Sequence, residues 1–294
     1  MPQVIPNQGR IAGRITLAAA TFLAAAAAHA GDPERGAYLA AVAGCASCHT
    51  DFEHGGRHYA GGPPLHSDFG TFRAPNITFD SDHGIGGWSE ADFVKALKQG
   101  VSPAGQPYYP AFPYLSYARM TDQDARDLYA YFRTVEPVRE ASPGHDLAFP
   151  FSVRTGLWAW RLLYFDPADD SFDTASRGGY LANALAHCGE CHTPRNRFGA
   201  LRRTMAMAGA RLGDGDVAGN LTPDPETGLD WDAVDLRFFL QTGLTPDGDA
   251  AGGAMALVVE HSTGKMTPED LDALVAWLQD LPAVRNTVKK PPSD

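Results

Sequence analysis

Apolar residues recur every three to four positions in two stretches, 124–132 and 270–278, one toward the end of each half of the chain. This spacing is the period of an amphipathic α-helix, so each stretch predicts a helix. Thr121 and Thr267 precede the two stretches as N-cap residues, and Pro268 suits a first helical position. The rest of each half predicts a shorter N-terminal helix followed by a long loop.

A different apolar pattern opens the chain. A positively charged start precedes an apolar run from Ile15 to Ala28, and small residues follow up to Ala30. These are the three parts of a secretory signal peptide, and a run of 14 residues is short for a membrane span, which needs about 20. We therefore expect residues 1–30 to be removed during export, leaving a soluble periplasmic protein with no transmembrane segment.

The charge of the chain is strongly acidic. Its formal net charge is −11, from 24 Lys and Arg against 35 Asp and Glu. Cleavage of the signal peptide would remove Arg10 and Arg14, which leaves 22 basic residues and a net charge of −13. Such a surface argues against nucleic acid and anionic lipid as partners, and it permits docking on a basic protein surface.

All four cysteines fall in two Cys-x-x-Cys-His motifs, the pattern of covalent c-type haem attachment. Two thiols three positions apart on one helical turn can both add to the vinyl groups of the porphyrin. The next residue then brings its imidazole to the iron. We expect two covalently bound haem c groups, held by Cys45, Cys48 and His49 and by Cys188, Cys191 and His192.

Three other uses of the cysteines remain open. A thioredoxin-like pair needs no histidine after it, and a zinc site of four cysteines would join motifs about 140 residues apart and leave both histidines unexplained. Two disulfides are compatible with the count in an exported protein. With 10 His in 294 residues, a histidine after both pairs has chance odds of roughly one in a thousand, which favours haem.

Sequence features recur at matching distances from the two motifs. Each motif is preceded by an Arg-Gly-x-Tyr-Leu string and followed by an Asn-x-Thr string, and a tryptophan lies 39 residues after each histidine. The matched residues are Arg35 and Arg177, Asn76 and Asn220, and Trp88 and Trp231. We interpret this as an internal repeat produced by duplication, and we expect the two asparagines to brace their loops by bonds from side chain to backbone.

The sixth ligand of the second iron is predicted to be Met255. It lies 63 residues after His192, in a Gly-rich loop before the last helix, and thioether is a common distal ligand of haem iron. Met266 is the competitor, but it stands next to the cap residue Thr267, where an apolar side chain packs as a staple.

The first half departs from this pattern. Phe112 stands at the position of Met255 and cannot bind iron. Met120 is the leading candidate for the first iron, although it aligns with the staple residue Met266. A histidine or an open iron stays an alternative, the histidines being His54, His58, His66 and His83.

The organisation of the chain resembles two tandem class I cytochrome c domains, an all-α fold with long haem-wrapping loops. The predicted divisions are a signal peptide (1–30), a first domain (31–140), an aromatic-rich linker (141–172), a second domain (173–285) and a C-terminal tail (286–294). A flexible tether would be polar, so we expect the linker to wrap and clamp the two domains, with partner docking as a second possibility.

Four strings make the resemblance more specific. They begin at Gly84 (GIGGWS), Tyr109 (YPAFPY), Phe149 (FPFSVR) and His187 (HCGECHTPR). They are similar to the bacterial dihaem and trihaem cytochrome c subunits of membrane-associated alcohol, gluconate and sorbitol dehydrogenases. The resemblance implies a protein that takes electrons from a dehydrogenase and passes them to quinone or another cytochrome. Members often carry a third haem domain and a C-terminal anchor, and this chain ends at Asp294 with neither, which weakens the expectation of quinone reduction.

The function that we predict is therefore electron transfer rather than bond-making catalysis. A periplasmic dihaem cytochrome would carry electrons from a dehydrogenase to a downstream cytochrome, oxidase or quinone-linked acceptor, with the Met255-ligated second haem as the exit of higher potential. The alternative is a haem enzyme, either a peroxidase or a small sulfur- or nitrogen-oxide oxidoreductase. It would use an open first haem, because Phe112 occupies the ligand position, and it would need His66 or His83 as an acid or base.

Overall fold

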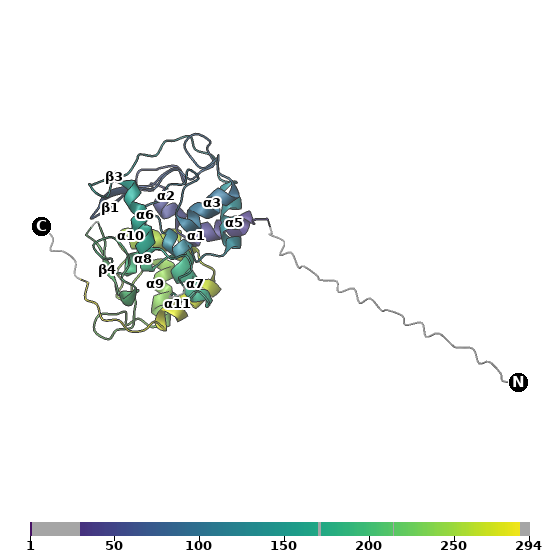
Figure 1. Ribbon diagram of the computed structural model, residues 1–294. Helices are drawn as coiled ribbons and strands as arrows, with labels where there is room; N and C mark the ends of the chain where they lie inside the picture. The colour runs from purple at the N-terminus through teal and green to yellow at the C-terminus, as the bar shows by residue number, and fades with distance from the viewer. Residues whose placement is uncertain (2–29, 170–171, 214, 289–294) are drawn as a thin grey trace.

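The first helix of each half packs against the last helix of that half. The computed structural model describes residues 1, 30–169, 172–213 and 215–288. In the first half α1 (Pro33–Val42) crosses α5 (Asp122–Phe132), and in the second α7 (Arg177–Tyr180) crosses α11 (Pro268–Gln279). Figure 1 shows the first half, in purple to blue, above the green to yellow second half.

Both crossings depend on a glycine. A Cβ atom on Gly36 would lie 1.9 Å from the carbonyl oxygen of Asp127, and one on Gly178 would lie 2.1 Å from that of Ala273. Because no larger side chain fits in such a space, the glycine of each Arg-Gly-x-Tyr-Leu string sets how closely the two helices approach.

The predicted closing helices and their N-caps are confirmed. Thr121 accepts a hydrogen bond from the backbone amide of Asp124 at the start of α5, and Thr267 accepts one from Asp270 at the start of α11. Each cap satisfies one of the amides that a helix start leaves unpaired. Both helices begin two residues earlier than the apolar pattern predicts.

Several elements lie where the sequence predicted only loops. In the first half these are α3 (Glu90–Gln99) and α4 (Tyr114–Tyr117), and in the second α9 (Ala233–Thr242) and α10 (Gly253–His261). Ser89 and Asp92 form a capping box at the start of α3, a local signal that the sequence reading missed. The short turns are Arg154–Gly156 (η1), Leu181–Leu185 (η2), Arg203–Met205 (η3) and Thr263–Lys265 (η4).

The sequence predicted an all-α fold. The core is helical, as predicted, but the molecule also contains β-strands. Two small antiparallel sheets lie at one side of the molecule (Figure 1). The first pairs β1 (Pro64–Ser67) with β2 (Gly70–Arg73), and β2 with β3 (Asp146–Leu147); the second pairs β4 (Ala210–Arg211) with β5 (Val217–Ala218). These strands are two to four residues long, too short to show an alternating pattern in the sequence.

One hydrophobic core runs through both halves. Leu39 and Phe132 from the first half and Leu181 and Leu274 from the second belong to a single buried cluster. A shared core of this kind predicts that the halves unfold together rather than independently.

The linker contacts both halves, as expected. Its strand β3 pairs with β2 of the first half, and its helix α6 (Leu157–Tyr164) places Trp160, whose Nε1 donates to the carbonyl of Phe198 in the second half at 2.8 Å. Asn286 of the predicted tail also belongs to the second half, because its Nδ2 donates to the carbonyl of Ala208 at 3.0 Å.

The predicted signal peptide lies outside the described residues except for Met1 and Ala30, and so do tail residues 289–294. Within the described part of the chain, no helix combines the length and the apolar character that crossing a membrane requires.

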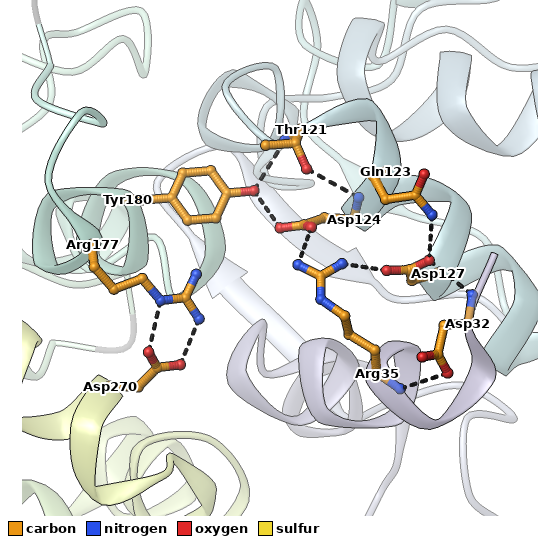
Figure 2. A network of polar contacts seen from close by, with 9 residues as sticks. All are labelled: Asp32, Arg35, Thr121, Gln123, Asp124, Asp127, Arg177, Tyr180 and Asp270. Atoms are coloured by element: carbon orange, nitrogen blue, oxygen red, sulfur yellow. Dashed lines mark hydrogen bonds and ion pairs between the residues drawn. The ribbon is translucent and has the colours of Figure 1, made fainter. Parts of the chain in front are cut away.

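A tyrosine from each half reaches the helix cap of the other half. The hydroxyl of Tyr180 donates to Asp124 Oδ2 at 2.6 Å and accepts from the amide of Thr121 at 3.0 Å (Figure 2). In the opposite direction the hydroxyl of Tyr38 donates to Asp270 Oδ2 at 2.5 Å. The amide of Thr267 lies 3.3 Å from the same hydroxyl, so the two contacts are reciprocal.

An arginine holds each of the aspartates that receive these tyrosines. Arg35 bridges Asp124 and Asp127, and Arg177 donates from Nε to Asp270 Oδ1 at 2.7 Å (Figure 2). Burial alone would raise the pKa of Asp270, but the bonds from Arg177 and from its tyrosine partner bring that pKa below its ordinary value. Asp270 is therefore ionised, and both aspartates are paired with an arginine of their own half and a tyrosine of the other.

We predict that Tyr180→Phe lowers the free energy of unfolding by about 1–3 kcal/mol, because it removes a bond to a buried carboxylate and leaves the Thr121 amide without its partner. Guanidinium unfolding of the oxidised protein with bound cofactor measures this. Tyr131→Phe is the matched control, since its hydroxyl donates to Tyr59 of the same half, at 3.5 Å. Equal losses in the two variants would show that the contact across the halves contributes nothing.

Candidate functional site

Each Cys-x-x-Cys-His motif lies in a short helix that follows the buried first helix of its half. The motif of the first half forms α2 (Cys45–His49), and Gly44 turns the chain into it with a φ of +63°. The second forms α8 (Gly189–His192), preceded by His187 at a φ of +42°. Because that conformation is uncommon for a residue other than glycine, the contact of His187 Nε2 with the Ala43 carbonyl, at 3.3 Å, helps to hold it.

Burial keeps three of the four motif thiols, those of Cys45, Cys48 and Cys188, protonated. None of Cys45, Cys48, Cys188 and Cys191 forms a disulfide. Burial raises the pKa of both Cys45 and Cys188 to about 12, and burial followed by the nearby Cys191 raises that of Cys48 to about 11. A reactive redox thiol has a lowered pKa, so these are not thioredoxin-like cysteines. The described residues also contain no group of three His, Cys, Asp or Glu side chains able to hold a metal ion by themselves.

The two motif histidines form the same hydrogen bond from Nδ1, which leaves Nε2 of each ring available. His49 Nδ1 donates to the carbonyl of Pro75 at 2.7 Å, and His192 Nδ1 donates to the carbonyl of Gly219 at 2.7 Å. A carbonyl can only accept, so Nδ1 carries the proton and Nε2 of a neutral ring is left as a metal ligand. Burial lowers the pKa of His49 to about 4 and also lowers that of His192, which keeps both rings neutral.

The residue after each histidine fixes the loop that follows. Thr50 Oγ1 accepts from the amide of Tyr59 at 3.0 Å, and Thr193 Oγ1 accepts from the amide of Met207 at 3.0 Å. Tyr59 and Met207 both have a φ near +60° and are buried. Neither residue was predicted as part of the site, and the signal that could have indicated them is the threonine that follows each histidine.

The predicted bracing by the two asparagines is confirmed. Asn76 Oδ1 accepts from the amide of Thr78 at 2.9 Å, and Asn220 Oδ1 accepts from the amide of Thr222 at 2.9 Å. Their Nδ2 groups donate to carbonyls that follow the closing helix of the same half, at Val138 (2.7 Å) and Val284 (2.8 Å). The carbonyls that receive the motif histidines therefore belong to loops tied down immediately beside them.

Met255 lies in a helix and not in a loop, which corrects the sequence interpretation. The helix is α10, which begins after Gly252 and continues through an apolar run. Met255 is half-buried and packs against the shared core, whereas Met266 is buried at the turn before α11.

The first half offers no methionine at the equivalent place. Phe112 is half-buried against Tyr108 and Tyr117, with ring centroids 5.7 and 5.9 Å away. Met120 is only 1% exposed and lies in the core, directly before the cap residue Thr121.

The four histidines that were alternatives lie at the surface. His54 Nδ1 contacts Asp51 at 3.0 Å, and His66 Nδ1 contacts Thr71 Oγ1 at 3.2 Å. His58 and His83 are exposed as well. The structure therefore does not bring any of them into the core beside Met120.

Each motif is in contact with the other half of the chain. Ser47 Oγ, between the first pair of cysteines, donates to the carbonyl of Leu257 in α10 at 3.5 Å. Ser116 Oγ of α4 donates to Glu190 Oε1, between the second pair, at 2.9 Å. Together with the effect of Cys191 on Cys48, these contacts place the two motifs beside each other at the boundary between the halves.

The residues fit a c-type haem. Each motif supplies two thiols that form no disulfide, on one helical turn, and a neutral imidazole whose Nε2 forms no hydrogen bond to a described residue. Buried aromatic and aliphatic side chains surround both motifs, which is the environment that a porphyrin needs.

Comparison with known proteins agrees with this chemistry. The family model described as "Cytochrome c" matches residues 33–136. A "Diheme cytochrome c-type" protein of Cereibacter sphaeroides is 44% identical over 86% of this chain and 87% of its own length.

Two further relatives are named as parts of dehydrogenases. The fructose dehydrogenase cytochrome subunit of Gluconobacter japonicus is 41% identical over 93% of this chain, and the gluconate 2-dehydrogenase cytochrome c subunit of Pantoea cypripedii is 40% identical over 92%. The chain spans 57% and 64% of the length of these two relatives. The described geometry and these similarities together show that the chain belongs to the family of bacterial c-type cytochromes that includes diheme cytochromes c and the cytochrome c subunits of dehydrogenases.

Proposed function

We propose that this protein is a periplasmic electron carrier with two covalently bound haems, one in each of two tandem class I cytochrome c domains at 31–140 and 173–285. The observation that carries the proposal is the matched pair of bonds from His49 Nδ1 and His192 Nδ1 to loop carbonyls, each in a Cys-x-x-Cys-His motif whose cysteines form no disulfide. The recurring sequence strings and the matched Thr–amide bonds support a duplication.

The residues have separate roles in this proposal. Cys45 and Cys48 attach the first haem and Cys188 and Cys191 the second, while His49 and His192 are the proximal ligands. The haem iron supplies a one-electron couple, and the chain sets its potential through the distal ligand, burial and hydrogen bonds. Pro75 and Gly219 hold the imidazoles in the orientation and tautomer that ligation needs.

The contact between the motifs supports exchange of electrons between the halves. Electron tunnelling falls steeply with distance, so neighbouring attachment sites favour a path with one entry and one exit. The shared core and the reciprocal tyrosines fix the separation. We propose Met255 as the distal ligand in the second half, which would make that haem the exit of higher potential, and Met120 as the ligand in the first.

The donor in this proposal is a dehydrogenase and the acceptor a downstream cytochrome, oxidase or quinone-linked protein. The names of the relatives support a dehydrogenase as the donor, since two of them are cytochrome subunits of dehydrogenases. The signal peptide that the sequence predicts at residues 1–30 supports the periplasmic location. A haem enzyme is less favoured, because His66 and His83, the acid or base candidates, lie exposed at the surface.

Removal of one pair of cysteines is expected to remove one haem. The matured wild-type protein should contain two covalent haems per chain by the pyridine haemochrome assay, and Cys45→Ala/Cys48→Ala or Cys188→Ala/Cys191→Ala should each contain one. Ser47→Ala, which changes the first motif without touching a thiol, is the control and should keep both. A wild type with a single haem would contradict the proposal.

The methionine assignments predict distinct redox titrations. Met255→Ala should lower the potential of one haem by on the order of a hundred millivolts, because the axial ligand is a main determinant of haem potential. Met120→Ala should lower that of the other, and Met266→Ala should change neither, since Met255 is the proposed ligand of the second half and Met266 is buried in the core. If Met120→Ala leaves both potentials unchanged, Met120 is a core residue and not a ligand.

A further inference from the structure

Exposed apolar side chains are concentrated in the linker. Twelve large hydrophobic side chains are exposed among the described residues, and six of them fall between positions 149 and 163. Single exposed apolar residues are ordinary on a protein surface, but a concentration of them marks an interaction site. The six are Phe149, Phe151, Val153, Trp158, Leu162 and Leu163.

The helix α6 exposes apolar side chains to solvent, whereas an ordinary surface helix exposes polar ones. Its exposed positions are Trp158, Ala159, Leu162 and Leu163, all of them apolar, and Leu162 and Leu163 are 87% and 72% exposed. The charged residue of the helix, Arg161, turns inward instead. Its Nη1 is buried, and its guanidinium lies over protein rings, including that of Phe165, 4.6 Å from the ring centroid. A helix that hides its charge and exposes its apolar face is built to be covered.

Positive charge lies beside this face. The bond from Trp160 Nε1 to the carbonyl of Phe198 ties α6 to the loop 195–203. In that loop Arg197 and Arg202 are exposed and form no ion pair with a described residue. Arg203 lines the same cavity of about 300 Å³ as Leu162 and Leu163, but it is paired with Asp169 at 2.8 Å, so the free positive charge is that of Arg197 and Arg202. A basic edge of this kind is unusual in a chain whose net charge is −11.

We propose that α6 docks this protein on the surface of a lipid bilayer, with Trp158, Leu162 and Leu163 at the boundary between headgroups and acyl chains and Arg197 and Arg202 at the lipid phosphates. An apolar face flanked by arginine, with Trp and Leu in it, is the pattern of interfacial helices. With eight residues α6 is too short to span a membrane, which needs about 20. The overall negative charge repels anionic lipid elsewhere on the molecule, so it favours one orientation.

A bilayer fits this face better than a protein partner does. Protein interfaces carry about one hydrogen bond per 100–200 Å². The exposed positions of α6 offer no charged side chain and one polar group, the indole N–H of Trp158, which interfacial tryptophans place among headgroups. Gly189 of the second motif lines the same cavity as Leu162, so docking would hold the second half next to the membrane. The inference does not rest on electron transfer and stands or falls separately from it.

Vesicle flotation of the matured protein with its haems tests the proposal. The wild type should float with vesicles of phosphatidylcholine and phosphatidylglycerol at 3:1. Leu162→Ser/Leu163→Ser should weaken binding at least about tenfold, because it removes apolar surface from the bilayer. Arg197→Gln/Arg202→Gln should weaken binding to these vesicles by about fivefold per arginine and leave binding to pure phosphatidylcholine unchanged.

Val234→Ser/Phe238→Ser is the matched control, since it removes two exposed apolar side chains from α9, and it should float like the wild type. The proposal is overturned if the wild type does not float, or if the α6 variant floats as well as the wild type. Sedimentation of the same samples identifies the alternative: a wild-type dimer that Leu162→Ser/Leu163→Ser converts to monomer, without flotation, would show that a second copy covers this face.

Discussion

His49 and His192 each donate a proton from Nδ1 to a backbone carbonyl at 2.7 Å, and the loops of both halves are arranged around this bond. The carbonyls belong to Pro75 and Gly219, each followed by an asparagine whose side chain ties the loop to the segment after the closing helix. Orientation of the imidazole thus depends on the whole half and not on the motif alone. This explains how long loops without a regular apolar pattern can hold each imidazole in one tautomer.

The two halves are joined by polar groups as well as by their common core. Tyr38 and Tyr180 each extend across the boundary to the other half. The first turns of α5 and α11 therefore each carry an aspartate that is bound by an arginine of its own half and a tyrosine of the other. Such an arrangement is rigid, because every buried charge in it has a partner and any displacement would leave a carboxylate unpaired. For the proposed exchange of electrons between two haems, this rigidity would keep their separation constant.

The sequence predicted those parts of the site whose chemistry is local. Thr121 and Thr267 cap helices through amides three positions away, and Asn76 braces its loop through the amide of Thr78, as expected. It could not predict what depends on packing between distant segments. The helix around Met255 was missed because glycines precede it, and the short strands were missed because they exist only through pairing. The linker contacts both halves as expected, but the outward direction of the apolar face of α6 could not be predicted, since composition does not distinguish a buried aromatic residue from an exposed one.

Carbon monoxide binding to the fully reduced, matured protein tests most directly whether both irons are held by two protein ligands. Phe112 occupies the place of Met255 in the first half, so that half is where a free coordination position would be found. The account of the protein as an electron carrier predicts that the optical spectrum is unchanged by carbon monoxide at both haems. Rapid binding at one haem, abolished by Phe112→Met, would contradict it and would identify the first iron as an open, reactive site.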